Sequence, residues 1–228
     1  MRADFPPAEL LRRQVQSLFP PGVVAGVARI GETAPLIDAE GNGLARMVPA
    51  RQAEFIAGRL ALRRAQAELG VPPFALINGP DRSPQWPDGY CGSISHAGGV
   101  AVVALCHSES GFGSLGLDIE EDRELSPELQ ENVLLPLERA ALARCDHAGR
   151  QARLIFCVKE CVYKAQYMFS RQLFGFEVIA VTLSDGAFMA QFMADMAPFR
   201  AGDCLKGRYV FTNGLVIAGM ALRDTQPR

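Results

Sequence analysis

The stretch VAVVALCHSESGFGSLGLDIE, residues 100–120, contains two strand patterns with a glycine-containing turn between them. Its first part, Val100–Cys106, is a continuous apolar run rich in β-branched residues, which is typical of a buried strand. Its last part, Leu115–Glu120, alternates, with apolar side chains on one face and Asp118 and Glu120 on the other. Two carboxylates therefore share one face of this strand, with their backbones roughly 7 Å apart.

Helix and strand patterns surround this stretch without a regular order. The spacing of apolar residues predicts helices over Ala50–Leu69, Leu134–Arg144 and Ala152–Phe169. Alternating or β-branched runs predict strands over Gly22–Ile30, Phe176–Leu183, Ala187–Met193, Gly207–Phe211 and Val216–Leu222. Prolines and glycines punctuate the rest of residues 1–45. Because helices and strands do not alternate as β-α-β units, the order indicates an α+β fold.

The composition excludes several classes of protein. With 228 residues, 49% of them hydrophobic, the chain is typical of a globular protein with one large or two small domains. A formal net charge of −2 gives no electrostatic case for binding nucleic acid. No apolar run approaches the roughly 20 residues that a membrane helix needs. The N-terminal residues show no signal peptide, so we expect a cytoplasmic location.

The six cysteines and three histidines show neither a C-x-x-C pair nor the spacing of a zinc site. We therefore interpret the cysteines as free thiols in a reducing compartment.

Three acidic side chains are candidates for a metal site. Asp118 and Glu120 offer the oxygen ligands that Mg²⁺ prefers, although two solvent-facing acids would give the same pattern. The segment FCVKECVYK, residues 156–164, has an apolar helical stripe that leaves Glu160 and Lys164 on the opposite face. This pair is either an exposed ion pair worth about 0.3–0.5 kcal/mol or, under a covering segment, a cation ligand or general base beside a phosphate-binding lysine.

Two further motifs suit phosphate groups. In GSISH, residues 92–96, a serine hydroxyl and the His96 imidazole lie at the end of an extended segment. On the helix over Ala50–Leu69, Arg51 and Arg59 offer planar guanidinium groups that make two-point hydrogen bonds. A structural histidine and solvated arginines are the alternatives.

The order and spacing of these motifs resemble the 4′-phosphopantetheinyl transferases of the Sfp/EntD class, and most of all its enterobactin-type subgroup. The resemblance runs from Arg51 to Leu183 and rests on FIAGR (55–59), WPDG (86–89), GSISH (92–96), GLDIE (116–120) and FCVKECVYK (156–164). The last two match the family's G-[IL]-D-x-E and [WF]-x-x-K-E-x-x-x-K patterns. Phe156 replaces a tryptophan found in many members, and Asn78 lies where relatives often carry a basic residue.

The resemblance implies a pseudo-dimer of two similar α+β halves, residues 1–112 and 113–228, with coenzyme A in the cleft between them. The implied reaction moves phosphopantetheine from coenzyme A to a serine of an acyl or peptidyl carrier protein and releases adenosine 3′,5′-bisphosphate. Such carriers serve fatty acid, polyketide, nonribosomal peptide and siderophore synthesis. The resemblance further implies a monomer that binds neither nucleic acid nor membrane.

The resemblance also assigns roles to side chains. Asp118, Glu120 and Glu160 would hold Mg²⁺ or Mn²⁺ against the pyrophosphate, with Asp118 also counted among the catalytic residues. Glu160 would accept the serine proton directly or through water, and Lys164 would stabilise the leaving phosphate. The expected contacts to coenzyme A phosphates are Arg51, Arg59, Ser95, His96, Lys159 and Lys164, with Arg63 and Arg82 as weaker candidates.

Two other functions fit the same residues. Three acids with a neighbouring lysine also suit a Mg²⁺-dependent phosphodiesterase or nuclease, although a pI near 6.0 disfavours a nucleic-acid substrate. A non-catalytic module that binds coenzyme A or a carrier protein is the second alternative.

Overall fold

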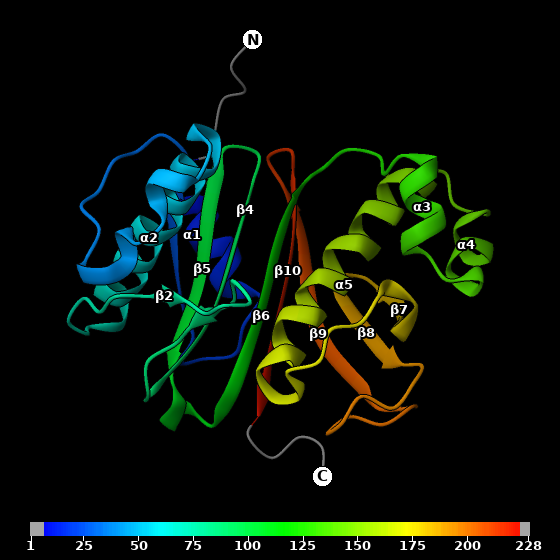
Figure 1. The fold of residues 1–228 in the computed structure, drawn as a ribbon. Helices are drawn as coiled ribbons and strands as arrows, with labels where there is room; N and C mark the ends of the chain where they lie inside the picture. Colours follow the sequence, from blue (N-terminus) through cyan, green and yellow to red (C-terminus); the bar gives the residue numbers. More distant parts are fainter. Residues whose placement is uncertain (1–6, 224–228) are drawn as a thin grey trace.

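The computed structural model describes residues 7–223, and Figure 1 shows their arrangement. The α-helices are α1 (Ala8–Ser17), α2 (Pro49–Leu69), α3 (Pro127–Val133), α4 (Pro136–Leu142) and α5 (Ala148–Ser170). The strands are β1 (Val24–Arg29), β2 (Ile77–Asn78), β3 (Pro84–Gln85), β4 (Tyr90–Ala97), β5 (Val100–His107), β6 (Phe112–Glu121), β7 (Ile179–Ser184), β8 (Ala187–Phe192), β9 (Cys204–Thr212) and β10 (Leu215–Arg223). Short 3-10 helices are η1 (Asp38–Gly41), η2 (Leu44–Arg46), η3 (Ser108–Ser110) and η4 (Phe176–Val178).

Two antiparallel sheets meet in the middle of the molecule. One sheet has three strands in the order β1-β5-β4, and the other has five in the order β6-β10-β9-β8-β7. Strand β4 packs against β6, so the two sheets are neighbours at these strands, while α2 covers the first sheet and α5 the second (Figure 1). Strands β2 and β3 form a separate small hairpin. The predicted α+β class is confirmed.

Each sheet brings its long helix close through a glycine. A Cβ added to Gly26 of β1 would lie 2.0 Å from the backbone oxygen of Ala61 in α2. A Cβ added to Gly116 of β6 would lie 2.2 Å from the backbone oxygen of Cys161 in α5. No side chain fits at either position, so the same device seats one helix on one strand in both parts of the chain.

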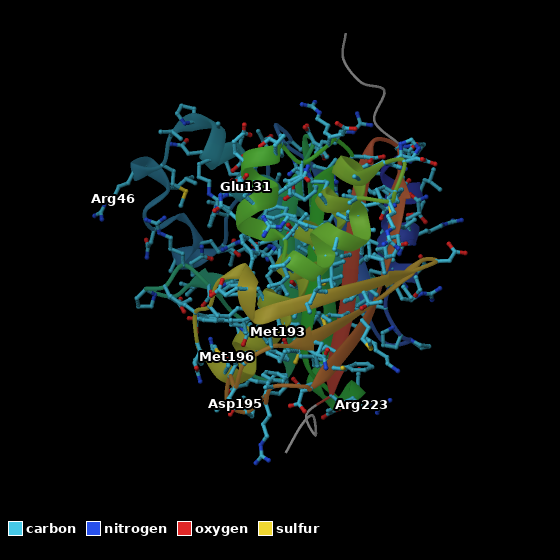
Figure 2. All side chains as sticks on the ribbon, turned by 90° about the vertical axis from the view of Figure 1, so that its right-hand side faces the viewer. Arg46, Glu131, Met193, Asp195, Met196 and Arg223 are labelled. Atoms are coloured by element: carbon cyan, nitrogen blue, oxygen red, sulfur yellow. The ribbon has the colours of Figure 1, made fainter. Side chains whose placement is uncertain are left out.

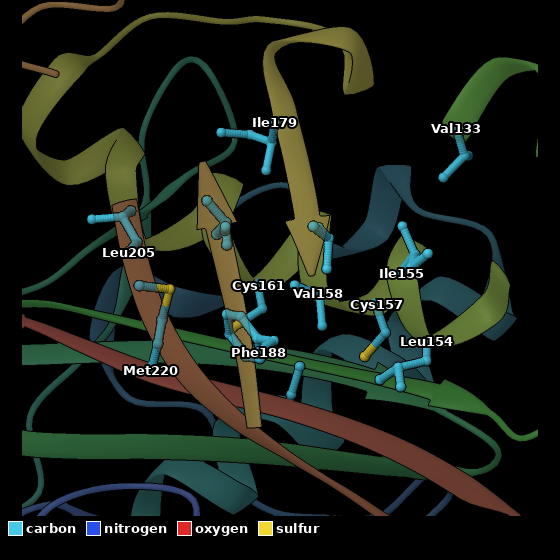
Figure 3. Close-up of a cluster of buried hydrophobic side chains, with 14 of the residues drawn as sticks. Val133, Leu154, Ile155, Cys157, Val158, Cys161, Ile179, Phe188, Leu205 and Met220 are labelled. Atoms are coloured by element: carbon cyan, nitrogen blue, oxygen red, sulfur yellow. The ribbon is translucent and has the colours of Figure 1, made fainter. Parts of the chain in front are cut away.

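The hydrophobic core joins the two parts. Helix α5 packs Cys157, Val158 and Cys161 against Phe188 and Met220 of the five-stranded sheet (Figure 3). A second cluster mixes residues from both sheets with α1, and its members include Leu11, Val15, Val102, Leu117 and Ile217. Because this cluster draws on both ends of the chain, its burial stabilises the contact between the two sheets as well as each sheet alone.

Helix α1 lies in a region that the sequence analysis treated as irregular. Leu11, Val15 and Leu18 are buried and follow helical spacing, directly after two prolines. The run is short, and its apolar positions alone did not distinguish it from the loops around it. The helix contributes to tertiary packing, because Leu18, which directly follows it, packs over Gly219 of β10.

Two other boundaries differ from the expectation. The helix predicted over Leu134–Arg144 begins at Pro136, because a residue before proline avoids the helical region, and a separate helix α3 precedes it. The strand predicted from Phe176 begins at Ile179, after the 3-10 turn η4.

The connection between β8 and β9, residues 193–203, lies at one end of the five-stranded sheet. Figure 2 shows Met193, Asp195 and Met196 gathered there, on a different part of the surface from Arg46. The six cysteines, all within residues 7–223, form no disulfide bond, and four of them are buried. Over residues 7–223, no helix is long and apolar enough to span a bilayer.

Candidate active site

Strands β4 and β6 and helix α5 meet around the ammonium group of Lys164. Strand β6 carries Asp118, strand β4 carries Ser95, and helix α5 carries Lys164. The Lys164 ammonium donates to Asp118 Oδ1 at 2.6 Å, to Ser95 Oγ at 2.9 Å and to the Leu117 carbonyl at 3.2 Å. The Ser95 hydroxyl donates to the same Asp118 oxygen at 2.8 Å. The predicted residues of the strand, the serine motif and the helix are therefore brought together.

A second serine fixes the register between the two sheets. The Ser93 hydroxyl accepts a hydrogen bond from the Leu117 N–H at 3.0 Å, and both residues are buried. Alternation along β4 places Ser93 and Ser95 on the same side, as the sequence pattern predicts. Ser93 thus satisfies a backbone group, whereas Ser95 contacts the Asp118 carboxylate.

Three carboxylates lie close enough to perturb one another. The pKa of Glu120 is raised to about 7, first by burial and next by the Asp118 charge, although Arg153 opposes both. Burial also raises the pKa of Glu160, with the Asp118 charge in second place. Asp118 itself is 3% exposed, and its Oδ2 atom has no hydrogen-bond partner in the structure. The site therefore holds more negative charge than its own cations satisfy.

These residues fit a divalent cation. A buried, unpartnered carboxylate oxygen is costly unless something positive binds it. The oxygen donors of Asp118, Glu120 and Glu160 are the type that Mg²⁺ and Mn²⁺ take. Within residues 7–223, no three histidine, cysteine or acidic side chains are gathered closely enough to hold a metal ion in this arrangement, and this includes Asp118, Glu120 and Glu160. Lys164 is the cation that contacts Asp118 in this arrangement.

A cavity of about 280 Å³ opens beside this cluster. Its lining brings together five of the predicted phosphate contacts, from both halves of the chain: Arg51, Arg59, Ser95, His96 and Lys164. Arg82 and Asn78 from the β2–β3 hairpin also line it. The predicted residues that suit phosphate therefore surround one common space. Hereafter this space is called the basic cavity.

His96 and Arg51 contact each other at the rim of the basic cavity. Arg51 Nη1 lies 2.6 Å from His96 Nε2, and Glu54 accepts from Arg51 at 3.0 Å. Burial lowers the pKa of His96, although the charge of Glu54 opposes this shift. A neutral His96 that accepts from Arg51 through Nε2 leaves Nδ1–H as a donor.

Arg59 lies deeper in the wall of the basic cavity. Its guanidinium donates to Asn78 Oδ1 at 2.8 Å and stacks over the Phe55 ring at 4.1 Å. Burial lowers its pKa to about 10, and its Nε makes no hydrogen bond within residues 7–223, although it lies 3.7 Å from Glu40 Oε1. A guanidinium beside a cavity with a donor that is not hydrogen-bonded is suited to an anionic ligand.

Two basic candidates do not line the basic cavity. Arg63 points toward Glu40, whose carboxylate it contacts at 2.6 Å. Lys159 is 2% exposed, and its ammonium donates to Glu138 at 2.8 Å and to the carbonyls of Val133 and Phe176. The structure thus differs from the expectation for Lys159, because all three of its donors are already used in the core.

Two smaller cavities flank α5. One, of about 240 Å³, shares Arg82, Ile94 and Lys164 with the basic cavity and adds Trp86, Tyr163 and Tyr167 among its lining residues. The other, of about 260 Å³, lies between Glu160 and the segment 173–176. Tyr163 and Tyr167 were not predicted as site residues from the sequence. Their spacing from Glu160 and Lys164, three residues in each case, places them near the polar face of the helix, and this periodicity is a signal that could have found them.

Comparison with known proteins agrees with this geometry. Residues 39–106 match the family model of the 4′-phosphopantetheinyl transferase N-terminal domain, and residues 114–212 match that of the 4′-phosphopantetheinyl transferase superfamily. The chain is 31% identical over 220 residues to the 4′-phosphopantetheinyl transferase Npt of Nocardia iowensis, covering 91% of this chain and 99% of Npt. It is 32% identical over 206 residues to the transferase PptT of Mycobacterium tuberculosis, covering 86% and 87%.

The enterobactin synthase component D of Escherichia coli K12 matches a shorter region. It is 36% identical over 118 residues, which is 50% of this chain and 54% of that protein. The enterobactin-type subgroup is therefore less well supported than the family as a whole.

Acids and a lysine beside a basic cavity, at the contact between two helix-covered sheets, suit a protein that binds a phosphorylated ligand. The chain belongs to the 4′-phosphopantetheinyl transferase family. It is an enzyme of this class, which transfers 4′-phosphopantetheine from coenzyme A to a carrier protein. The prediction made from the motifs is confirmed at this level.

Proposed function

We propose that this transferase uses a divalent cation, Mg²⁺ or Mn²⁺, held by Asp118, Glu120 and Glu160. The unpartnered Oδ2 atom of buried Asp118 is the single observation that carries this proposal. The raised pKa values of Glu120 and Glu160 support it, because burial and the Asp118 charge outweigh the nearby cations, Arg153 and Lys164. When bound, such an ion offsets charge on the pyrophosphate oxygens during transfer.

Glu160 is the proposed general base. Burial raises the pKa of its carboxyl group, so it binds a proton more readily than an exposed glutamate. It also lines the cavity beside segment 173–176, which is separate from the basic cavity lined by Arg51 and Arg59. A carrier serine that approaches from this side meets the carboxylate either directly or through one water.

Lys164 is the proposed partner of the leaving phosphate. Burial opposes its charge, but the Asp118 carboxylate outweighs this effect and raises the pKa of the ammonium. Lys164 thus stays protonated and can donate a hydrogen bond or a proton to the phosphate oxygen that becomes free.

The basic cavity is the proposed site for the phosphate groups of coenzyme A. Arg51 and Arg59 would bind the 3′-phosphate, while Ser95 and His96 would contact the phosphates nearer to Lys164. The lining of one common space by all five side chains supports this assignment. The Arg59 pair with Asn78 accounts for an asparagine where a basic residue was expected, since the amide orients the guanidinium.

The two halves are proposed to be residues 1–112 and 113–228. The repeated seating of a long helix on a glycine of a strand supports this division. The basic cavity draws on both halves of a single chain, so we propose that a monomer is active. Six cysteines without a disulfide bond suit a reducing compartment, and we propose a cytoplasmic location.

The proposed substrates are carrier proteins of nonribosomal peptide, polyketide and siderophore synthesis. The name of the enterobactin relative is the only support for the last of these. The test incubates the protein with coenzyme A, Mg²⁺ and a panel of unmodified carriers and measures each carrier by intact-protein mass spectrometry. Gain of one phosphopantetheine group, abolished by a chelator, supports the proposal. Modification that persists at the same rate in the chelator would overturn the role of the cation.

A further inference from the structure

The β2–β3 hairpin, residues 77–85, lies at the boundary between the basic cavity and the cavity of Trp86 and Tyr163. Its tip is closed by two backbone hydrogen bonds, from Gly79 to the Ser83 carbonyl at 2.8 Å and from Arg82 to the Gly79 carbonyl at 2.9 Å. Arg82 lines both cavities. The position of the Arg82 guanidinium therefore determines how much positive charge faces the space between the two cavities.

Arg82 has an unusual combination of features. Its backbone has a φ of 66°, in the left-handed region that a residue with a Cβ atom avoids. Its side chain is exposed, and within residues 7–223 its guanidinium makes no hydrogen bond or ion pair. Because the Arg82 guanidinium has no partner among the described residues and its backbone conformation is unfavourable, other contacts must hold this part of the hairpin in place.

Asp81 supplies those contacts. Its Oδ1 atom accepts hydrogen bonds from the Ser83 N–H at 3.0 Å and from the Ser83 hydroxyl at 2.8 Å. Its Oδ2 atom accepts a hydrogen bond from the Tyr167 hydroxyl at 2.5 Å. Tyr167 belongs to α5, so this single bond connects the hairpin of the first half to the helix that carries Lys164 and Glu160.

We propose that Tyr167 is a positioning residue: by binding Asp81 it holds the hairpin closed and keeps the Arg82 guanidinium directed at a phosphate group of coenzyme A. This inference rests on the proposed placement of coenzyme A phosphates in the basic cavity. Arg82 itself is the contact to the co-substrate, and Tyr167 acts through it.

Electrostatics favours the same arrangement. A carboxylate at the entrance of a phosphate site repels the ligand and competes for neighbouring arginines. The Tyr167 and Ser83 hydrogen bonds already engage both oxygens of Asp81. Without the Tyr167 hydroxyl, the Asp81 carboxylate is free to pair with Arg82, which follows it directly in the chain.

The variant Tyr167→Phe isolates the hydroxyl. The Tyr167 ring stacks on Tyr163 at a centroid distance of 6.0 Å, and phenylalanine retains this contact. Tyr209→Phe is the matched control, because the Tyr209 hydroxyl also makes one hydrogen bond, to the Ser184 carbonyl at 2.7 Å on the five-stranded sheet. Both variants lose one hydroxyl, and only one of them touches the hairpin.

The experiment is a double-mutant cycle on coenzyme A affinity, measured by titration calorimetry and by KM and kcat with a carrier. Tyr167→Phe should raise the Kd and KM for coenzyme A about three- to tenfold, the effect of one hydrogen bond, with kcat within about twofold. Arg82→Met should raise both about tenfold or more, as expected for a charged contact. The double variant should be no weaker than Arg82→Met alone, because Tyr167 acts through Arg82.

The chain holds a single tryptophan, Trp86, which lines the same cavity as Asp81 and Arg82. Its fluorescence therefore reports on the hairpin without any substrate. Acrylamide should quench Trp86 more strongly in Tyr167→Phe than in wild type, and equally in Tyr209→Phe and wild type.

Additive losses in the cycle, or unchanged Trp86 quenching in Tyr167→Phe, would overturn the positioning role. A wild-type protein that binds no coenzyme A would instead overturn the proposed function, and with it the role of Arg82.

Discussion

The Lys164 ammonium lies 2.6 Å from Asp118 Oδ1 and 2.9 Å from Ser95 Oγ, so one cation joins a helix to strands of the two different sheets. Within residues 7–223, the second oxygen of Asp118 makes no hydrogen bond. In the proposed function, this half-satisfied carboxylate binds the divalent cation at the contact between the two sheets.

Lys164→Met should destabilise the metal-free protein and nearly abolish transfer. The change removes the cation beside a buried carboxylate and leaves Asp118 Oδ1 with the Ser95 hydroxyl, at a cost of about 1–3 kcal/mol. Urea unfolding in a chelator measures the loss, and added Mg²⁺ should restore part of it. Lys206→Met, on an exposed position of β9, is the control and should unfold like wild type. Equal stability of the two variants would contradict this role of Lys164.

Glu160→Gln should lower kcat by a factor of about 10²–10⁴ while leaving the Kd for coenzyme A close to that of wild type. The amide keeps the shape of the side chain but accepts no proton from the serine. Steady-state kinetics with a carrier provide the measurement, and Glu177→Gln at an exposed position is the control. A Glu160→Gln enzyme with normal kcat would exclude this residue as the base.

The metal-free protein should lose stability as the pH rises from about 4.5 to 7. Because burial raises the pKa of Glu120 to about 7, the folded state favours the protonated form. That stabilisation is complete below the ordinary pKa of 4.5 and is lost through pH 7, by as much as about 2–3 kcal/mol.

Urea midpoints at pH 5 and 7.5 in a chelator test the pH dependence. Relative to wild type, Glu120→Gln should show a smaller decrease between the two values. Mg²⁺ should also reduce the decrease in wild type, because it stabilises the ionised carboxylate. An identical decrease in wild type and Glu120→Gln would show that this residue is not the source.

Lys159→Met should destabilise the protein by about 3–5 kcal/mol, because it leaves the buried Glu138 carboxylate without its cation. Adding Glu138→Leu should recover only part of this loss, since Glu138 also accepts the N–H groups of Leu135 and Val181. Where Lys159→Met is folded, its KM for coenzyme A should match that of wild type. A selective rise in KM would restore Lys159 as a phosphate contact.

Arg59→Met should weaken the binding of coenzyme A more than the binding of 3′-dephospho-coenzyme A. A guanidinium bound to the 3′-phosphate contributes about 1.5–3 kcal/mol, or roughly tenfold or more in Kd. Arg63→Met does not serve as a control, because Arg63 pairs with buried Glu40. Arg64→Met, on the same helix and paired with the more exposed Glu32, is the matched variant. Equal losses for the two ligands would contradict the 3′-phosphate assignment.

Strand and helix periodicity predicted much of the site. Alternation along Leu115–Glu120 put Asp118 on a polar face, and the 3-4 spacing of α5 put Glu160 and Lys164 opposite its apolar stripe. The two lysines of that helix could also have been separated by periodicity. Lys159 and Lys164 are five residues apart, which is about 140° around a helix. They therefore face different neighbours, and only Lys164 reaches Asp118.

Other contacts depend on tertiary structure that no local pattern reveals. Glu138, the partner of Lys159, comes from a separate short helix. Asp81 and Tyr167 lie 86 positions apart, and their hydrogen bond exists only because the hairpin and α5 meet at the contact between the halves.

Titration of Mn²⁺ by electron paramagnetic resonance, in the presence of coenzyme A, tests the central claim most directly. The account predicts one tightly bound ion per chain in wild type and a loss of at least about tenfold in affinity for each of Asp118→Asn, Glu120→Gln and Glu160→Gln. The matched variant Glu177→Gln should bind like wild type. Unchanged Mn²⁺ affinity in the three site variants would contradict a shared cation between β6 and α5.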